Sequence, residues 1–432
     1  MITEVKKMRK RIASLLIGGV LVASTAFGLT GCQTGGGKEK LVLWGPAAQQ
    51  LSLKEMVDQF LEENPDFGLE IELGIAGEGD VKGLMSNDPK SGADVYGYAN
   101  DQVIDLLTMG GLARLGTTVV DGLKEANTAQ SVEAGKVGEG YYGYPYAADN
   151  GFFMYYDKSV VSEEDTANLK DVLEACRKKH KYFIYQLTTG WYVGSFAYGA
   201  GATYEAVYGG EDDTTLTKVE CNFDQLSPDG AGTYTYGEIG GQQLIDLNSH
   251  TAFQDGNDDT ITTYLSEGKL GACITGTWLA GTIEEYLKTN YGVATLPDWT
   301  SSLTGETYHW VSFAGYKLYG VNSYSKHLPE AHKLAAFLSS EKMQEKRFDD
   351  NKIGPSNKNV AAMEKVKSNL AIATIAKEIE ETAITQKPMP GTYWTEMEAF
   401  GKAMKDWKKR EDKSQTLAER VQELVKALKE VK

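Results

Sequence analysis

Cysteine and histidine are scarce in this 432-residue chain, which holds four and five of them. No Cys-x-x-Cys pair occurs, no Cys/His spacing of a zinc site is present, and the histidines are scattered. We therefore expect no resident metal and no cofactor. Cys176, Cys221 and Cys273 are interpreted as buried thiols, although one pair could form a disulfide.

Signature motifs of common enzyme classes are also missing. There is no GxSxG, HExxH or GxxxxGK[ST], and segment 74–83 has Lys82 where a dinucleotide loop needs its third glycine. Segment 255–266 begins like a calcium loop but lacks its glycine and its final glutamate, so Asp259 is interpreted as a helix cap. Acidic pairs are abundant, which leaves the carboxylate pair of a glycosidase open. Nothing in the sequence requires an enzyme.

Positive charge is in deficit. The chain has 44 basic and 60 acidic side chains, and its formal net charge is −16. Removing residues 1–31, which carry five basic side chains and one acidic one, would change the net charge to −20. This balance argues against binding nucleic acid or anionic substrates. The 24 tyrosines and seven tryptophans suit a polar ligand with flat apolar faces, although such rings are also ordinary core material.

The first 31 residues have the pattern of a secretory signal, with a basic start, an apolar stretch and small residues at its end. A permanent transmembrane helix is the less favoured alternative. The ending Leu-Thr-Gly-Cys resembles a bacterial lipobox, which implies that Cys32 receives a lipid and becomes the first mature residue. Residues 32–40 would then be a flexible tether. We expect the protein at the extracellular face of the bacterial cell membrane.

The remaining residues alternate between strand and helix patterns. Strands are predicted at 41–44, 69–73 and 93–98, and helices at 53–61, with a Ser52–Glu55 capping box, and at 102–109. This alternation predicts an α/β fold with open, doubly wound sheets. About 400 residues are too many for one simple core and indicate two domains or two lobes. The apolar face of the last helix, from Leu417 to Leu428, is interpreted as packing.

Several segments, in order, resemble bacterial extracellular solute-binding lipoproteins of the maltose/maltodextrin-binding protein family. They are 92–115, 143–161, 264–281, 290–299, 313–322, 353–360 and 387–400. The resemblance implies a two-lobed periplasmic-binding-protein-like α/β fold, each lobe an open mixed sheet flanked by helices, with the ligand cleft between the lobes. Its implied boundaries are 41–150 with 317–353 for the first lobe, and 151–316 with 354–432 for the second.

The same resemblance implies a set of ligand contacts. Asp101 matches a hydroxyl-binding aspartate, with a plain helix cap as the alternative, and Asp149 stands where the family has a glutamate. Trp278 is favoured most, because it also follows a predicted strand at the sheet end that faces the cleft. The full set of expected ligand-binding residues is Tyr98, Asp101, Asp149, Asn150, Trp191, Tyr192, Trp278, Tyr393 and Trp394.

The resemblance implies a monomer that captures an oligosaccharide, with maltose and maltodextrins preferred, and delivers it to the permease of an ABC importer. Two alternatives remain open. The same fold could bind another oligosaccharide, a polyamine or a metal chelate, although the aromatic residues argue against the last two. A surface glycosidase is the alternative from another class.

Overall fold

The computed structural model describes residues 38–411 and 413–430. The predicted signal segment, Cys32 and most of the tether lie outside the described residues. Within the described part, the chain forms two lobes, each with its own sheet.

The first lobe is built on a six-stranded mixed sheet. Its strands follow the order β17-β16-β3-β1-β2, and β6 also pairs with β16. The first three strands of the chain are parallel, whereas β16 runs antiparallel to β3 and β6. The strands are β1 (Lys40–Gly45), β2 (Glu70–Ile75), β3 (Val95–Ala99), β6 (Tyr144–Asn150), β16 (Phe313–Val321) and β17 (Ile384–Thr385).

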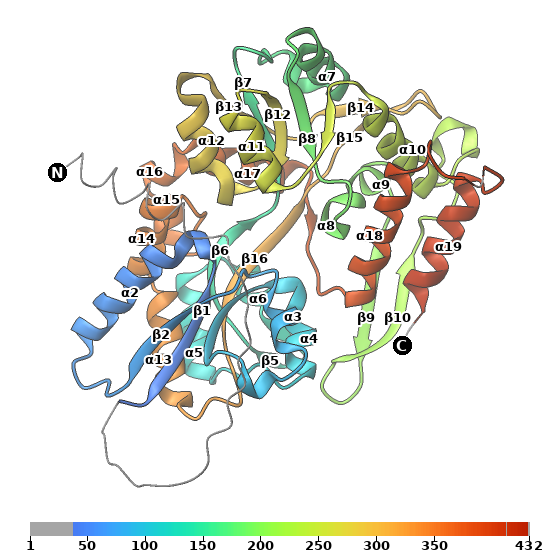
Figure 1. The fold of residues 1–432 in the computed structure, drawn as a ribbon. Coiled ribbons are helices and arrows are strands. Elements are labelled where there is room, and N and C mark those ends of the chain that lie inside the picture. Colours follow the sequence, from blue (N-terminus) through green and yellow to red (C-terminus); the bar gives the residue numbers. More distant parts are fainter. Residues whose placement is uncertain (1–37, 412, 431–432) are drawn as a thin grey trace, which may run out of the picture. The chain divides into compact units, whose positions relative to one another are not determined.

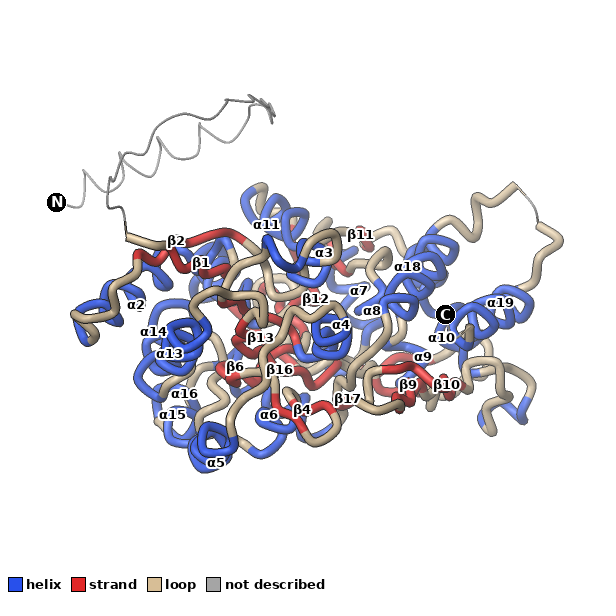
Figure 2. Tube along the Cα trace, turned by 90° about the horizontal axis from the view of Figure 1, so that it is seen from below, coloured by secondary structure: helices blue, strands red, loops and turns tan. Residues whose placement is uncertain are grey.

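Helices cover both faces of this sheet. Successive side chains of a strand point to opposite faces, so each strand contributes side chains to the contacts on both sides. Val95 packs with the helices of one face, and Tyr96 and Tyr98 pack with those of the other. Figure 2 shows α13 and α14 on one side of β6 and β16, and α3 and α4 on the other. The helices of this lobe are α2 (Gln50–Glu63), α3 (Val81–Met85), α4 (Val103–Thr108), α5 (Thr117–Ala126), α6 (Ala129–Glu133), α13 (Leu328–Leu338) and α14 (Glu341–Asn351).

The second lobe contains a five-stranded sheet in the order β11-β8-β12-β7-β13. Its strands are β7 (Phe153–Asp157), β8 (Tyr182–Tyr185), β11 (Phe253–Asp255), β12 (Leu270–Thr275) and β13 (Tyr291–Ala294). Its helices are α7 (Leu169–Lys178), α8 (Gly190–Val193), α9 (Ser195–Gly199), α10 (Tyr236–Ser249), α11 (Asp258–Ser266), α12 (Ala280–Leu287), α17 (Leu370–Glu381), α18 (Gly391–Lys405) and α19 (Leu417–Lys429). Shorter pieces are the hairpins β4–β5 (Lys136–Val137, Gly140–Tyr141), β9–β10 (Tyr204–Gly209, Thr215–Cys221) and β14–β15 (Asp298–Thr300, Thr307–His309), and the helices α15 (Lys358–Ala362) and α16 (Glu364–Lys367).

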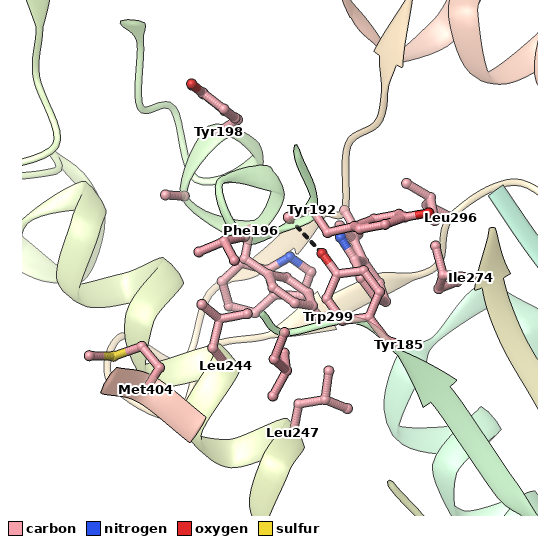
Figure 3. Packing of buried hydrophobic residues seen from close by; sticks show 14 of the residues in the cluster. Tyr185, Tyr192, Phe196, Tyr198, Leu244, Leu247, Ile274, Leu296, Trp299 and Met404 are labelled. Carbon is pink, nitrogen blue, oxygen red and sulfur yellow. Dashed lines mark hydrogen bonds between the residues drawn. The ribbon is translucent and has the colours of Figure 1, made fainter. Parts of the chain in front are cut away.

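The core of the second lobe is rich in aromatic rings. Phe196 stacks on Trp310 with ring centroids 4.2 Å apart, and Tyr185 meets Trp310 edge-on at 4.7 Å. Trp299 is buried against Phe196 in the same cluster (Figure 3). Rings of this size remove much apolar area from water and favour edge-to-face or offset contacts. They give α8 and α9 a rigid support.

The chain passes between the lobes at β6 and β16, which lie side by side in an antiparallel pair (Figure 1). The first crossover follows β6, where Asn150 leads within three residues to β7. The chain returns to the first lobe at β16 and leaves it again through a second connection, residues 352–357, which follow α14 and lead to α15. These crossovers place residues of both lobes beside one another.

Most predicted elements are confirmed, but three predicted caps are wrong. The helix predicted to start near Leu53 begins at Gln50, so Ser52 lies inside α2 and donates to Asp350 Oδ2 at 2.7 Å instead of capping. The cap of α11 is Asn257, whose side chain accepts from Thr260 N, and Asp259 lies in the first turn. Asp101 caps no helix through its side chain, because it lies inside a short 3-10 turn before α4.

Two further predictions concern cysteines and the last helix. Cys176, Cys221 and Cys273 are free and buried, as the thiol interpretation requires. In α19, Val421, Leu424, Val425 and Leu428 are buried in the core of the second lobe, which confirms the packing role of that face. None of the helices in the described part of the chain has the length and apolar character needed to span a bilayer.

Candidate ligand-binding site

Three partly buried tryptophans of the second lobe, together with Phe313, form what we call the aromatic wall: Trp191, Trp278 and Trp394. The rings of Trp191 and Trp278 lie 5.8 Å apart. Phe313 stacks on Trp191 at 6.3 Å and meets Trp394 edge-on at 6.4 Å. The three side chains come from α8, from the turn after β12 and from α18, so only the fold brings them together.

Trp278 is held in one orientation by its own turn. It lies in the 3-10 turn Thr277–Leu279 between β12 and α12, and its Nε1 donates to Asp258 Oδ2 at 2.8 Å. The ring folds back over Gly276, where an added Cβ would lie 1.9 Å from the indole. Because the ring is fixed at its edge and only partly buried, one part of it stays available for a ligand.

Lys317 faces this wall from β16 and was missed by the sequence analysis. Its Nζ lies 5.4 Å from the centroid of the Trp278 ring, and the residue is 5% exposed. Among the described residues it forms no hydrogen bond or ion pair. The ring face stabilises the ammonium group electrostatically. The signal in the sequence was a single lysine within the otherwise uncharged strand FAGYKLYGV.

A second group of polar residues surrounds Gln386, which sequence analysis also missed. Asn150 Nδ2 lies 3.4 Å from Gln386 Oε1, and Asn100 Nδ2 donates to the Gln386 carbonyl at 2.7 Å. Asp101 is 8% exposed, and its carboxyl group hydrogen-bonds with Gln386. The structure therefore brings the predicted Asp101 and Asn150 together, through a glutamine that lies just after β17.

Burial raises the pKa of Asp101 to about 7, with a smaller contribution from the nearby Asp105. The charge of Lys82 and the hydrogen bonds that Asp101 accepts oppose this shift but do not cancel it. A carboxyl group with this pKa changes between hydrogen-bond donor and pure acceptor near neutral pH. Its ability to accept from ligand hydroxyls therefore depends on pH.

The other predicted residues are buried within the protein. Tyr98 is 0% exposed, and its hydroxyl donates to the Tyr142 carbonyl at 3.3 Å. Tyr393 is also 0% exposed and shares a 2.5 Å hydrogen bond with the Tyr198 hydroxyl. Tyr192 packs against Phe152, behind Trp191. In this structure Tyr192 and Tyr393 support the neighbouring tryptophans, and Tyr98 belongs to the core of the first lobe.

Asp149 lies at the first crossover and is 1% exposed. Its Oδ2 accepts from Thr277 Oγ1 and from Gly354 N, each at 2.6 Å. Beside it is a cavity of about 310 Å³, lined largely by small and aliphatic side chains of α15 to α17 and by the second connection. This cavity therefore lies at the crossovers, and none of the three wall tryptophans lines it.

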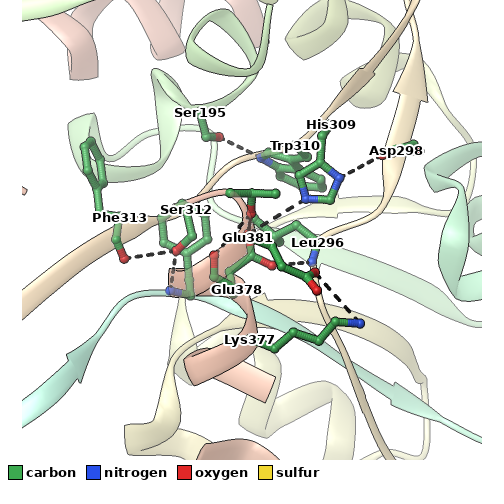
Figure 4. Close-up of polar contacts among 12 residues, drawn as sticks. Ser195, Leu296, Asp298, His309, Trp310, Ser312, Phe313, Lys377, Glu378 and Glu381 are labelled. Carbon is green, nitrogen blue, oxygen red and sulfur yellow. Dashed lines mark hydrogen bonds and ion pairs between the residues drawn. The ribbon is translucent and has the colours of Figure 1, made fainter. Parts of the chain in front are cut away.

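The segment that leads into Phe313 is fixed by buried polar contacts (Figure 4). Ser312 Oγ accepts from Phe152 N at 2.8 Å, which joins this segment to the first crossover. Glu378 is 0% exposed, accepts from Leu296 N at 2.8 Å, and has a pKa raised by its burial. His309 lies between Glu378 and Asp298, with Nδ1 2.7 Å from Asp298 Oδ1. The Ser312 bond thereby fixes the residue before Phe313 to the first crossover.

Metal ligands are not gathered anywhere in the described residues, where no three His, Cys, Asp or Glu side chains could hold one ion together. The chemistry available here is that of recognition: ring faces and an ammonium group at the wall, and a carboxyl group and amides around Gln386. Such a combination can stack on apolar faces of a ligand and pair with its hydroxyl groups.

Residues 55–374 match the family described as "Bacterial extracellular solute-binding protein", and the chain belongs to this family. Its two lobes, each a mixed sheet flanked by helices, are the architecture of the solved maltodextrin-binding proteins to which it is similar. Membership of a solute-binding family supports a binding role over a catalytic one.

The chain is similar to the "Galactooligosaccharide-binding protein" of Bacillus subtilis, with 24% identity over 74% of each chain. It is also 25% identical to a "Maltooligosaccharide ABC transporter solute-binding lipoprotein" of Streptococcus pneumoniae, over 71% of this chain and 69% of that one. A protein solved with acarbose has 28% identity and a TM-score of 0.76, over 91% and 99% of the two chains. The Thermus thermophilus maltotriose binding protein has the same fold, with 19% identity and a TM-score of 0.71 over 90% and 98%.

Proposed function

We propose that this chain captures an oligosaccharide between its lobes, with maltodextrins preferred, and delivers it to an ABC importer. The aromatic wall carries the proposal. Sugar rings offer flat CH faces that stack on aromatic side chains, and their hydroxyl groups pair with amides and carboxylates. Three partly buried tryptophans beside the ammonium group of Lys317 match these requirements.

In the proposed complex, Trp278 and Trp191 stack on successive sugar rings, and Trp394 extends the wall. Lys317 donates to a ligand oxygen, and Asp101 and Asn150 take paired hydroxyl groups from the side of the first lobe. Tyr192 packs against Trp191 and Tyr393 packs against Trp394, so both support the wall. The complete burial of Tyr98 and Asp149 argues against direct contact with the ligand.

Two relatives support two sugar classes. The similarity to the maltooligosaccharide lipoproteins of Streptococcus pneumoniae supports an α-glucan ligand. The similarity to the galactooligosaccharide-binding protein of Bacillus subtilis supports a second candidate, a galactose-containing oligosaccharide. Both sugar classes present CH faces to stack on and hydroxyl groups to bond, so the aromatic wall suits either one.

A sugar panel tests the proposal. We would titrate maltotriose, maltotetraose, galactotriose and cellotriose while recording tryptophan fluorescence and binding heat. Saturable binding of one class supports the proposal, whereas binding of none of the four contradicts it. Release of reducing sugar from starch or galactan in the same samples would indicate a glycosidase instead.

We further propose that Cys32 carries a lipid and tethers a monomeric binding protein at the outer face of the membrane, beside its permease. The predicted signal segment and the lipobox-like ending support this. The proposed lobe boundaries remain those given by the resemblance: 41–150 with 317–353, and 151–316 with 354–432. A protein tethered in this way explores only the space near its importer.

Replacing Cys32 tests the tether. In Cys32→Ala the thiol that would accept the lipid is lost, so we expect the protein in the medium and no incorporation of a tagged fatty acid. Cys221→Ala, which removes a buried thiol, is the control and should be labelled like the wild type. Undiminished label on Cys32→Ala would contradict the proposal.

A further inference from the structure

One oxygen of Asp149 joins three distant segments of the chain. Asp149 is the penultimate residue of β6, where the chain leaves the first lobe. Its Oδ2 accepts hydrogen bonds of 2.6 Å from Gly354 N and from Thr277 Oγ1. Gly354 is 205 residues away from Asp149 in the sequence, and Thr277 is 128 residues away. The residue is 1% exposed, so water does not compete for these bonds. Hydrogen bonds to a carboxylate are roughly twice as strong as neutral ones.

The three segments have different tasks. Asp149 belongs to the first crossover, and Gly354 to the connection between α14 and α15. Thr277 begins the turn that carries Trp278. The Asp149 side chain therefore links the Trp278 turn to the first crossover and to the connection at Gly354. A shift of the turn would act on both connections through this side chain.

The surroundings of Asp149 are packed on one side and open on the other. At Gly354, an added Cβ would lie 2.8 Å from Asp149 Cβ, so the connection passes directly against the aspartate. The other oxygen, Oδ1, is buried and has no partner among the described residues. The cavity of about 310 Å³ is lined by Asp149, Gly354 and mostly aliphatic side chains. This cavity is partly open to solvent, so the connections are not closely packed on that side.

We propose that Asp149 is a positioning residue, which transmits the orientation of the Trp278 turn to the lobe connections and does not itself touch the ligand. This inference rests on the proposed function, because Trp278 is its platform for the sugar. Stacking of a sugar ring fixes the turn, the Thr277 hydroxyl holds Asp149, and Asp149 holds Gly354. Ligand binding and lobe closure are thereby coupled through two hydrogen bonds.

A matched pair of variants at Thr277 tests the coupling with maltotriose, or with whichever trisaccharide of the panel binds the wild type. Thr277→Val removes the hydroxyl group and keeps the branched shape, whereas Thr277→Ser keeps the hydroxyl group. Loss of a hydrogen bond to a charged group corresponds to about a ten- to hundredfold change in affinity. We expect that loss for Thr277→Val and a change of less than about threefold for Thr277→Ser.

A double-mutant cycle separates positioning from direct contact. If Asp149 acts through Thr277, Asp149→Asn weakens binding in the wild type but has little further effect in Thr277→Val. If Asp149 touches the sugar, the two losses multiply, and that result would overturn the inference. Equal affinity of Thr277→Val and the wild type would overturn it as well.

Failure of the proposed function gives a different result. In that case the wild type itself binds none of the trisaccharides, and the role of Asp149 in sugar binding fails with it. A misfolded variant is recognised by its circular dichroism and by chemical denaturation. If Asp149→Asn misfolds, Asp149→Ser takes its place in the cycle. If Thr277→Val misfolds, Thr277→Ala takes its place, because each substitute truncates the same contact.

Discussion

At the scale of single residues, the aromatic wall is defined by how its tryptophans are held. Trp278 is tied by its indole nitrogen to Asp258, and Trp191 is backed by Phe152 at 5.0 Å. Side chains fixed in this way lose little further freedom when a ligand binds. Rigid aromatic side chains in partly desolvated surroundings are the usual hot spots of binding sites. The largest losses of affinity are therefore expected here.

Removing the Trp278 ring should weaken sugar binding far more than it weakens the fold. A hot-spot aromatic side chain contributes about 2–4 kcal/mol, so Trp278→Ala should lose roughly thirty- to a thousandfold in affinity by calorimetric titration. The free energy of unfolding should fall by less than the about 3–5 kcal/mol of a core truncation.

Two controls accompany the Trp278 variant. Trp278→Phe keeps a ring face and loses only the bond to Asp258, so it should retain most of the affinity. Trp407→Ala removes a tryptophan that lies against Arg410, outside the wall, and should bind like the wild type. Unchanged affinity of Trp278→Ala for the best ligand would exclude Trp278 as a platform.

The raised pKa of Asp101 predicts a pH dependence of binding. In the free protein this pKa is about 7, and ligand hydroxyl groups that donate to the carboxylate would lower it in the complex. Fewer protons are then bound in the complex, so affinity rises with pH up to about 7 and is constant above it. We expect a gain of about three- to tenfold between pH 5.5 and 7.5. In Asp101→Asn, titration should be flat, and a wild-type profile without slope would contradict the proposed contact.

At the scale of elements, the second lobe depends on close contacts between helices. Gly240 of α10 packs directly on α9, where an added Cβ would lie 2.5 Å from the backbone nitrogen of Ala197. α9 directly follows α8, which carries Trp191, so this contact helps to fix the position of that tryptophan. The position requires glycine because of its neighbour and not because of its own backbone conformation.

Gly240→Ala should therefore destabilise the protein, by about 1–3 kcal/mol in chemical denaturation, as overpacking usually does. The matched control is Gly122→Ala in α5, where an added Cβ meets nothing within 4 Å. There, alanine should stabilise the helix by about 0.5–1 kcal/mol, because glycine loses more freedom on folding. Equal effects of the two substitutions would contradict the assigned packing.

At the scale of the whole molecule, the lobes are joined by short crossovers beside a cavity. Such connections allow rigid lobes to move about a few residues that absorb the change of backbone angles. The wall belongs to the second lobe, whereas Lys317 and Asp101 belong to strands and turns of the first lobe's sheet. A ligand that contacts both sides favours the closed arrangement by its differential affinity for it.

We expect small-angle scattering to give a smaller radius of gyration with saturating sugar than without it. Trp278→Ala at the same sugar concentration is the control and should keep the radius of the free protein. An unchanged radius in wild-type protein that calorimetry shows to be saturated would contradict closure by the ligand.

Much of the fold could be predicted from the sequence, because local patterns are set by neighbours along the chain. The apolar run LVLW and the helical spacing from Leu53 to Leu61 correctly placed β1 and most of α2. Helix caps were less predictable. Ser52 hydrogen-bonds to Asp350, which is 298 residues away, and no local sequence pattern indicates such a partner. The apolar face of α19 was visible because its apolar residues repeat with the helical turn.

The candidate site was predictable only in part. By itself the sequence determined the alternation of strands and helices, the shortage of metal ligands and the position of Trp278 after a strand. The tertiary structure alone decided that Trp191 and Trp394 contact Phe313 and that Trp278 contacts Trp191. It also decided that Lys317 faces Trp278, and that Asp149 is buried against Thr277 and Gly354. The physical reason is distance along the chain: these contacts join residues about 40 to 205 positions apart, and their geometry depends on how two sheets and their crossovers pack.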